Sequence, residues 1–365
     1  MATTRLSRNF RRVLSLLALL GFAVASAPAQ TTAVRPNVTV LAYNVDNLFD
    51  ATPDGTEYPE YRPRQGGWTD RLYRERLANT AKVIRESTAG GPDIVVLEEV
   101  ENPAVLQTLA NRYLKQLGYG SYVMVPVAGS AINVGILTRF AVTSVRAHKV
   151  LADTRHPLRN ILEVTLDVRG VPLTLFACHW KAKSGGSQVT EEGRRIASHI
   201  IITRMQALLR ARPDAEVMVV GDLNESVNEY ERTGGQYQTA LIDLDGTTLS
   251  PELAGSYAHD SIFVVDKPDE MHMVPEALVL YSPWGTVPPG TGSYWYRGTW
   301  ETIDQFLLGP GLVDRRGLSF TGFQVVDKGY LINRLGHPAA WRTSAGSGYS
   351  DHLPILLTLS IIPAN

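Results

Sequence analysis

Four short polar segments of the chain each follow directly after an apolar run. They are Tyr43-Asn44 in VLAYNVDNLFD, Glu98-Glu99 in DIVVLEEVEN, Asp222 with Asn224 in VMVVGDLNE, and Ser350-Asp351-His352 in GYSDHLPILL. A carboxylate or amide at the end of a buried strand lies where a rigid scaffold meets solvent. If several of these groups converge, they form an acidic metal pocket with a histidine beside it, which is suited to the hydrolysis of phosphate esters.

The donor atoms of these segments indicate the kind of metal. Carboxylate and amide oxygens favour a hard cation such as Mg²⁺, Mn²⁺ or Ca²⁺. The chain has no HExxH motif and no Cys/His cluster with zinc spacing, which argues against zinc hydrolysis. It also has no Walker A loop, no dinucleotide-binding glycine fingerprint and no GxSxG elbow, which argues against nucleotide switches, dehydrogenases and serine hydrolases. The oxygen-rich set consists of Asn44, Glu99, Asp222, Asn224 and Asp351.

The histidine of the last segment needs a partner, because a polar ring beside a carboxylate on an apolar strand is costly when it is unpaired. Adjacent residues of a strand face opposite ways, so Asp351 is not expected to orient His352. Asp304, in the apolar run 303–308, is the candidate partner. A buried carboxylate there would hold the imidazole tautomer and raise its basicity. A purely structural salt bridge is the alternative.

A second histidine, His179, closes another apolar run and is followed by the turn SGG. A histidine at that place can donate to a phosphoryl oxygen, and Lys181 and Lys183 are close enough in sequence to attract the same anion. A histidine packed in the core is the competing interpretation. Arg159 is a further anion candidate with weaker support.

Spacing decides which acidic groups can share a pocket. Asp222 and Asn224 are two residues apart at a strand exit, so both can point the same way, and Gly221 allows a tight turn before them. Glu98 and Glu99 are adjacent, so only one of them is expected to face a given pocket. Taken singly, the first pair is more often an Asx turn than a site. A solvated strand end explains the second pair equally well.

The elements that position these groups alternate between strands and helices, with more strand than helix. Apolar periodicity predicts helices over 69–86, from Asn102-Pro103 to near Gly118, and over 190–211. Short apolar or alternating runs between Gly, Asp and Pro breakers predict the strands. The predicted strands are 38–43, 94–97, 122–127, 132–138, 142–150, 161–168, 173–178, 217–220, 303–308 and 353–359.

One stretch resists assignment. Residues 246–292 are rich in Pro and Gly and show no sustained period, so they are predicted to form an irregular insertion or a substrate-shaping loop. The chain contains no internal repeat and no extended low-complexity tract. Residues 30–365 are therefore expected to form a single domain.

The first 29 residues have the order of a secretory signal peptide: four arginines, an apolar stretch over 13–25, and small residues ending at Ala29. The apolar stretch is too short to span a bilayer comfortably. Cleavage after Ala29 would give a periplasmic or fully secreted protein. It would remove four of the 35 basic residues and none of the 36 acidic ones, leaving 31 basic residues and a formal net charge of −5. A protein that binds nucleic acid through its global charge would instead be basic.

Six motifs occur in the order YNVDNLFD, LEEVEN, HWKAKSGG, GDLNE, TIDQFLL and YSDHLP. In this order they resemble the endonuclease/exonuclease/phosphatase superfamily, whose members include deoxyribonuclease I, and they are most similar to its exported bacterial members. The resemblance extends over nearly the whole mature chain. It implies an α/β fold, a four-layer sandwich in which two mostly antiparallel sheets pack face to face with helices outside.

The resemblance also implies roles for the residues that match its motifs. Asn44, Glu99 and Asp351 would hold the metal, with Mg²⁺ or Mn²⁺ expected first and Ca²⁺ as an alternative. Asp222 would orient or deprotonate the attacking water, and Asn224 would contact the phosphate.

The histidines and the basic residues complete the implied site. His179 would bind the phosphoryl group, and His352 paired with Asp304 would form an acid/base dyad. Lys181 and Arg159 are the expected substrate contacts. These roles agree with the charge that develops on the phosphoryl oxygens and the leaving group during in-line attack.

One segment departs from the family pattern. Related exported members have Arg-Gly-Ile-Asp-Val before a strand, whereas residues 130–134 of this chain read SAINV, so the arginine and the acid are both missing. Asn133 could still contact phosphate at this place. The loss of the arginine predicts an altered grip on the substrate or weaker catalysis.

These observations predict a secreted, divalent-metal-dependent phosphodiesterase, first of all a nuclease with DNA or RNA as its partner, without a membrane span or a protein partner. A phosphatase or phospholipid phosphodiesterase of the same fold is the alternative, because the metal chemistry is shared. A phospholipase would need an exposed apolar loop, and only the aromatic-rich segment 281–300 could supply one, although a packed aromatic patch is the simpler interpretation. A noncatalytic module that binds anions or a partner is the third possibility.

Overall fold

The computed structural model describes residues 37–63, 65–151, 158–274 and 276–363. The chain from Pro36 to Asn365 forms one compact unit. The expected signal peptide, residues 1–29, lies outside the described residues. No helix in the described part of the chain is both long enough and apolar enough to cross a lipid bilayer.

One sheet has six strands in the order β15-β16-β1-β2-β4-β3. All neighbouring pairs are antiparallel except β1 with β2, which run parallel at its centre. The carboxyl ends of β1 and β2 therefore reach the same edge of the sheet. Its strands are β1 (Asn37–Leu48), β2 (Ile94–Val100), β3 (Ser121–Val123), β4 (Asn133–Thr138), β15 (Gly317–Val325) and β16 (Ile355–Ile362).

The other large sheet has eight strands in the order β5-β6-β7-β8-β14-β11-β10-β9. Its central pair β7 and β8 is parallel, and β14 runs antiparallel on the other side of β8. Its strands are β5 (Ala141–His148), β6 (Ile161–Val168), β7 (Val171–His179), β8 (Glu216–Asp222), β9 (Leu241–Asp243), β10 (Ile262–Val265), β11 (Val279–Tyr281) and β14 (Asp304–Leu308).

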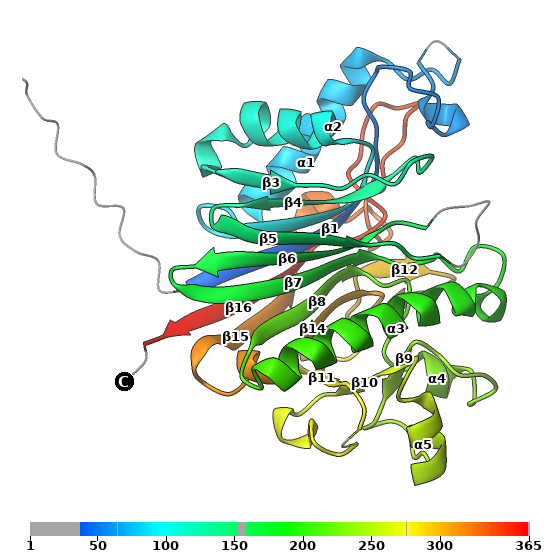
Figure 1. Ribbon diagram of the computed structural model, residues 1–365. Helices are drawn as coiled ribbons and strands as arrows, with labels where there is room; N and C mark the ends of the chain where they lie inside the picture. The colour runs from blue at the N-terminus through cyan, green and yellow to red at the C-terminus, as the bar shows by residue number, and fades with distance from the viewer. Residues whose placement is uncertain (1–36, 64, 152–157, 275, 364–365) are drawn as a thin grey trace, which may run out of the picture. The chain divides into compact units, whose positions relative to one another are not determined.

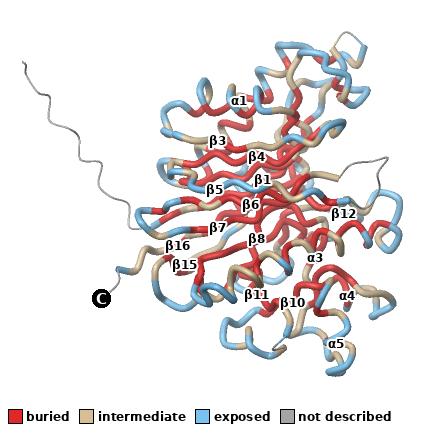
Figure 2. The backbone as a smooth tube through the Cα atoms, in the orientation of Figure 1, coloured by how far each residue is buried: buried red, intermediate tan, exposed pale blue. Residues whose placement is uncertain are grey.

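The two sheets pack face to face and carry helices on their outer faces (Figure 1). Alternation along β1 explains this arrangement: Val38, Val40 and Ala42 pack in the core between the sheets, whereas Leu41 and Tyr43 pack under the helices. The helices α1 (Asp70–Glu86) and α2 (Pro103–Thr108) cover the six-stranded sheet, and α3 (Ser187–Ala211) covers the eight-stranded sheet. Buried residues follow the strands of both sheets (Figure 2). The expected four-layer α/β sandwich is confirmed.

Local signals explain where the first helices begin and end. The hydroxyl of Thr69 accepts the Leu72 amide at 3.3 Å and caps α1. The side chain of Asn102 accepts the Val105 amide at 3.0 Å and caps α2. The expected helix up to Gly118 is present but is not uniform, because a π-helical turn over 109–113 and a 3₁₀ turn over 115–117 follow α2 before Gly118 ends it at φ +71°.

The prediction of an irregular region over 246–292 is wrong. The segment contains the helix α5 (Pro251–Tyr257) and two strands of the eight-stranded sheet, β10 and β11. All residues of β10 and β11 are buried. Each strand has only three or four residues, which is too short to show a period among the surrounding Pro and Gly residues.

A short hairpin was also missed. Its strands β12 (Tyr294–Tyr296) and β13 (Thr299–Glu301) are joined by Arg297 and Gly298. Both turn residues have positive φ, 45° and 91°, which is the geometry of the two-residue turns that fit the twist of a hairpin. Tyr294 forms an isolated bridge with His352, so the hairpin lies against the YSDHLP segment.

Strand pairing brings distant polar segments together. In the eight-stranded sheet, Asp222 at the end of β8 pairs with His179 on one side and with Asp304 on the other. In the six-stranded sheet, Asn44 of β1 pairs with Glu98 of β2. The polar residues therefore collect at one edge of the sandwich, where the central strands of both sheets end.

Candidate active site

A pocket of ≈ 820 Å³ opens at this edge between the two sheets. It contains most of the residues that the sequence singled out: Asn44, Glu99, His179, Asp222, Asn224, Asp351 and His352. The outer part of the pocket is formed by the turn after β7, the short helix α4 (Glu229–Arg232) and the β12–β13 hairpin. These elements contribute Lys183, Glu229, Arg232, Tyr294, Tyr296, Arg297 and Glu301.

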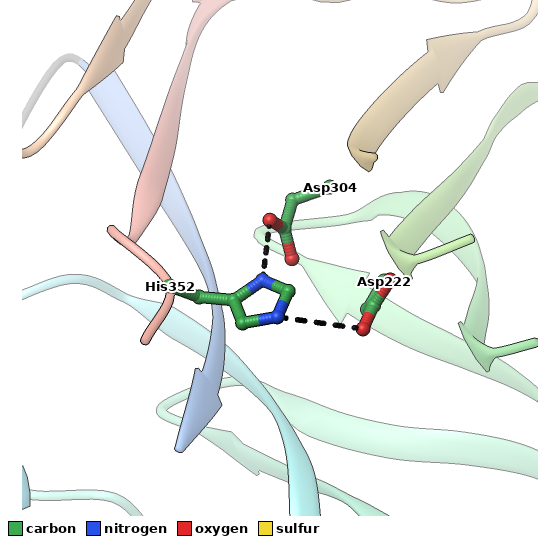
Figure 3. Close-up of side chains that lie close together, drawn as sticks. All are labelled: Asp222, Asp304 and His352. Carbon is green, nitrogen blue, oxygen red and sulfur yellow. Dashed lines mark hydrogen bonds and ion pairs between the residues drawn. The ribbon is translucent and has the colours of Figure 1, made fainter. Parts of the chain in front are cut away.

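The imidazole of His352 lies between two carboxylates (Figure 3). Its Nδ1 is 2.8 Å from Asp304 Oδ2, and its Nε2 is 4.0 Å from Asp222 Oδ2. Ser293 donates to the same oxygen of Asp304 at 2.5 Å and holds that carboxylate in place. The predicted pairing of His352 with Asp304 is thus present, and Nε2 is left to face the pocket.

The charges around His352 determine its protonation. Burial acts to lower the pKa of His352, but the carboxylates of Asp304, Asp351 and Asp222 outweigh burial and hold that pKa well above its usual range. The imidazole is therefore protonated at neutral pH and presents an N–H at Nε2. Such a group can donate a proton to a leaving oxygen.

His179 has the opposite character. Burial lowers its pKa well below the usual range, and the positive charges of Arg159 and His352 lower it further. Its Nε2 is 3.6 Å from Asp222 Oδ2 and 3.8 Å from Glu99 Oε1. A neutral imidazole at this place can donate one hydrogen bond to a phosphoryl oxygen without adding charge.

Asp222 is buried at the centre of the group. Asn44 Nδ2 donates to its Oδ2 at 2.9 Å, and the backbone amide of Asn224 donates to its Oδ1 at 2.8 Å. Burial raises the pKa of Asp222, the charge of His352 lowers it, and the neighbouring Asp304 raises it again, with a net increase. A carboxylate whose pKa is raised in this way is a stronger base than an exposed aspartate.

Three carboxylates, Asp46, Glu99 and Asp351, form a cage of mutually repelling charges. The pKa values of Glu99 and Asp46 are raised first by burial and next by the charge of Asp351. Carboxylates that repel one another at partly buried positions are stabilised by a cation, and an all-oxygen set suits a hard divalent ion. The residues present therefore fit such a metal. Oε2 of Glu99 accepts the Asn47 amide at 2.9 Å, which fixes its direction.

Asn44 holds the cage in shape. Its Nδ2 donates to Glu99 at 3.2 Å as well as to Asp222, and its Oδ1 accepts the backbone amide of Asp46 at 3.0 Å. In this geometry Asn44 orients two carboxylates, and its oxygen keeps a second lone pair. The role of Asn44 as a metal ligand stays a prediction. Asp46, which the sequence did not single out, meets Asn44 through its backbone amide, and its Oδ1 accepts Asn47 Nδ2 at 3.2 Å.

Glu98 and Glu99 separate as their adjacency predicts, but Glu98 is not solvated. It continues the inward-facing series of β2, is 0% exposed, and has no hydrogen-bond partner at either oxygen. Burial raises its pKa well above the usual range, followed by the charges of Asp304 and Asp222. Gly221, at φ +127°, makes room for it, because a Cβ there would lie 2.7 Å from Glu98 Oε1 and 2.2 Å from the Cys178 carbonyl oxygen.

The structure corrects the expected substrate contacts. Asn133 is buried outside the pocket, where its amide nitrogen donates to the Glu101 carbonyl at 2.8 Å and its oxygen accepts the Val127 amide at 3.0 Å. It therefore holds two loops together. Lys181 does not line the pocket, whereas Lys183 does.

Arg159 affects the site through the backbone at the end of β7 and through its charge. Its guanidinium donates to the carbonyl oxygens of His179, at 3.2 Å, and of Trp180. It does not line the pocket, although its charge lowers the pKa of His179. Arg159 therefore positions the end of β7, and its direct contact with substrate stays a prediction.

Backbone strain marks the same region. Asp46, Asn47, Glu99 and Asn224 all have positive φ, between 52° and 65°. Non-glycine residues rarely adopt this conformation, and its clustering is typical of functional sites. In the sequence, Asp46 and Asn47 were signalled only by their place in the motif YNVDN, two and three residues after Asn44. Nothing in the local sequence indicated that Tyr294 would stack on His352 at 4.6 Å.

Comparison with known proteins agrees with this geometry. The sequence pattern of the Endonuclease/Exonuclease/phosphatase family matches residues 39–239, which is more than half of the chain. No curated protein matches the chain by sequence.

Several solved structures share the fold. A humanized D. rerio TDP2 has a TM-score of 0.53 at 16% identity, and D. rerio TDP2 complexed with a single-strand DNA product has a TM-score of 0.51 at 16% identity. The Bacteroides thetaiotaomicron mannosyl-6-phosphatase Bt3783 has a TM-score of 0.51 at 14% identity. Each likeness covers 89% of this chain and 100% of the other. At these identities the likeness establishes the fold.

Proposed function

Because the chain belongs to the endonuclease/exonuclease/phosphatase family, whose members hydrolyse phosphoester bonds, we propose that it is a divalent-metal-dependent phosphodiesterase that cleaves nucleic acid. The observation that carries this proposal is the convergence of a protonated His352, a neutral His179 and the carboxylate of Asp222 in one pocket. These three groups supply an acid, a neutral hydrogen-bond donor and a base within reach of one phosphorus atom.

Each residue has a defined part in the proposed reaction. Asp222 accepts a proton from the attacking water, and His179 and Asn224 hydrogen-bond the phosphoryl oxygens. The P–O bond to the leaving group then breaks as His352 Nε2 gives its proton to the departing oxygen, while Asp304 stabilises the imidazolium. A divalent ion held by Asp46, Glu99 and Asp351 would supply electrostatic stabilisation of the charge on the phosphoryl group.

The rim of the pocket supports a nucleic-acid substrate over a small phosphomonoester. Tyr294 and Tyr296 stack on each other with ring centroids 6.2 Å apart, and Arg297 lies over the Tyr296 ring at 5.2 Å. Aromatic faces beside a cation are the usual platform for the bases of a single strand. The aromatic residues of the hairpin therefore do not form only the expected packed patch, because one face of the hairpin lines the pocket.

The first experiment compares substrates with the purified mature chain. Supercoiled plasmid, a single-stranded oligonucleotide and p-nitrophenyl phosphate are incubated with Mg²⁺, with Mn²⁺ or with EDTA. We expect cleavage of the nucleic acids in either metal, none in EDTA, and slow hydrolysis of the monoester. Preferential hydrolysis of the monoester would instead favour a phosphatase, the activity named for the Bacteroides thetaiotaomicron structure.

Two variants and a matched control make the assignment specific. Asp222→Ala and His352→Ala should each lower the rate by about 10²- to 10⁴-fold. His199→Ala is the control, because that histidine lies on α3 with its side chain 55% exposed and pairs with Asp260. If Asp222→Ala cleaves as fast as the wild type, the cleavage comes from a contaminating nuclease. That result would overturn the proposal.

We also propose that the chain is exported and cleaved after Ala29. The charged, apolar and small-residue order of residues 1–29 supports this. Expression of the full chain in a bacterium, followed by N-terminal sequencing of the periplasmic fraction and the medium, tests it. A chain that keeps residues 1–29 would rule out the cleavage.

A further inference from the structure

A second group of carboxylates lies outside the pocket, at the base of the loop that follows β1. Asp54 and Glu57 belong to this loop, and Glu101 follows the last residue of β2. One oxygen from each of the three carboxylates lies within 4.8 Å of the others. None of the three lines the pocket of the candidate active site.

Two members of this group are buried, and one of them, Glu101, is incompletely satisfied. Glu101 is 3% exposed; its Oε2 accepts the Asp50 amide at 2.7 Å, but its Oε1 has no hydrogen-bond partner. Glu57 is 4% exposed and accepts the backbone amides of Asp54 and Gly55. A buried carboxylate oxygen without a donor is costly unless a cation or proton meets it.

A second acidic group in the same molecule shows how the protein neutralises such clusters itself. Asp245, Asp266 and Glu270 also approach one another, and Lys267 Nζ lies between 3.1 and 4.0 Å from all three. No described Lys, Arg or His forms an ion pair with Asp54, Glu57 or Glu101. Within the described residues, the group around Lys267 is therefore neutralised by a side chain of the protein, whereas the group around Glu101 is not.

We propose that Asp54, Glu57 and Glu101 form a second cation site, which takes Ca²⁺ and stabilises the loop. Calcium accepts carboxylate oxygens at varied angles and tolerates a site built partly from a loop, whereas Mg²⁺ demands near-octahedral geometry. The loop already begins under restraint, because Trp68 Nε1 donates to the Asp50 carbonyl at 2.6 Å. The site joins the loop to the end of β2, two residues beyond Glu99.

Calcium binding by the full mature chain tests this independently of catalysis. Thermal unfolding in EDTA and in millimolar CaCl₂ is compared for the wild type and for Glu99→Gln, which weakens any ion binding in the active site. We expect Ca²⁺ to raise the Tm of both by roughly 5 °C. Asp54→Asn and Glu57→Gln should lose most of this shift, and Asp266→Asn should retain it.

Terbium gives a second readout that does not depend on the melting curve. Because Trp68 contacts the loop, excitation of tryptophan should sensitise Tb³⁺ bound at the site, and Ca²⁺ should displace it. The signal should persist in Glu99→Gln and be lost in Glu57→Gln. A Ca²⁺ effect that disappears in Glu99→Gln but persists in Asp54→Asn and Glu57→Gln would assign all binding to the active site and overturn the proposal. No Ca²⁺ effect in any variant would overturn it as well.

Discussion

At the scale of single residues, the two pocket histidines show how neighbours divide one side-chain type into two roles. His352 is surrounded by carboxylates and is held protonated, whereas His179 is buried beside cationic groups and is held neutral. The acid/base assignment therefore depends on partners that lie far away in the sequence. Asp304 is 48 residues from His352.

The pH dependence of the rate follows from this arrangement. A raised pKa keeps His352 protonated past neutrality, so a rate that requires its proton falls only as pH rises through that pKa. In Asp304→Asn the raising charge is removed, so the pKa of His352 falls and the alkaline limb of the profile should move to lower pH. The measurement is kcat/KM against pH for both proteins. An unmoved limb would show that another group controls it.

At the scale of elements, a buried ion-pair network fixes α3 to the loops beside the site. Arg194, 0% exposed on its side chain, bonds Glu225 at 2.8 Å and Glu191 at 2.5 Å. Those glutamates in turn accept the backbone amides of Leu241 and Ala240. The charge of Arg194 is therefore neutralised inside the fold.

Removing this arginine should therefore be costly. Arg194→Met leaves two buried carboxylates without their counter-charge, and the free energy of unfolding should fall by about 3–5 kcal/mol. The neighbouring Arg195→Met is the control, because that side chain is 33% exposed, makes one ion pair at 2.7 Å and should cost less than about 1 kcal/mol. Urea unfolding monitored by circular dichroism measures both. Equal losses would contradict the assigned network.

The β12–β13 hairpin leads to a prediction about substrate binding. Tyr296 is 44% exposed and lines the pocket, so Tyr296→Ala should remove one base-stacking contact, worth about 1–3 kcal/mol. The KM for a single-stranded oligonucleotide should rise by about 5- to 100-fold, with little change in kcat. Tyr122→Ala, also exposed at 41% but outside the pocket, should behave as the wild type. Steady-state kinetics decide the matter.

At the scale of the whole molecule, one core between the sheets supports the site. Leu357 of β16 and Phe306 of β14 both belong to it, although they lie in different sheets. The catalytic edge therefore has its geometry only when the two sheets are packed together. Residues 30–365 carry a formal net charge of −5, so a polyanion must be held by local contacts at the rim.

A core substitution should affect both sheets at once. Leu357→Ala should lower the free energy of unfolding by about 2–5 kcal/mol, whereas Leu335→Ala, 78% exposed, should change it by less than about 0.5 kcal/mol. Tryptophan fluorescence and far-UV circular dichroism should give one coincident transition for the variant. Separate transitions would show that the sheets unfold independently.

The sequence by itself determined the types of chemical group, their order, and most strands and helices. β6 lies at the predicted residues, and Thr69 and Asn102 cap the predicted helices, because apolar period and capping are local properties. The six family motifs are also short local segments, and the resemblance that they carry was enough to predict the fold. The short strands β10 and β11 escaped, since three or four residues carry no period.

Only the tertiary structure decided which polar groups meet. Strand register places Asp222 between His179 and Asp304, the backbone amide of Asp46 donates to Asn44, and sheet packing removes Asn133 from the pocket. The hairpin over His352 and the unpartnered oxygen of Glu101 follow from the same packing. Register and burial depend on contacts between residues tens to hundreds of positions apart, which no local pattern in the chain encodes.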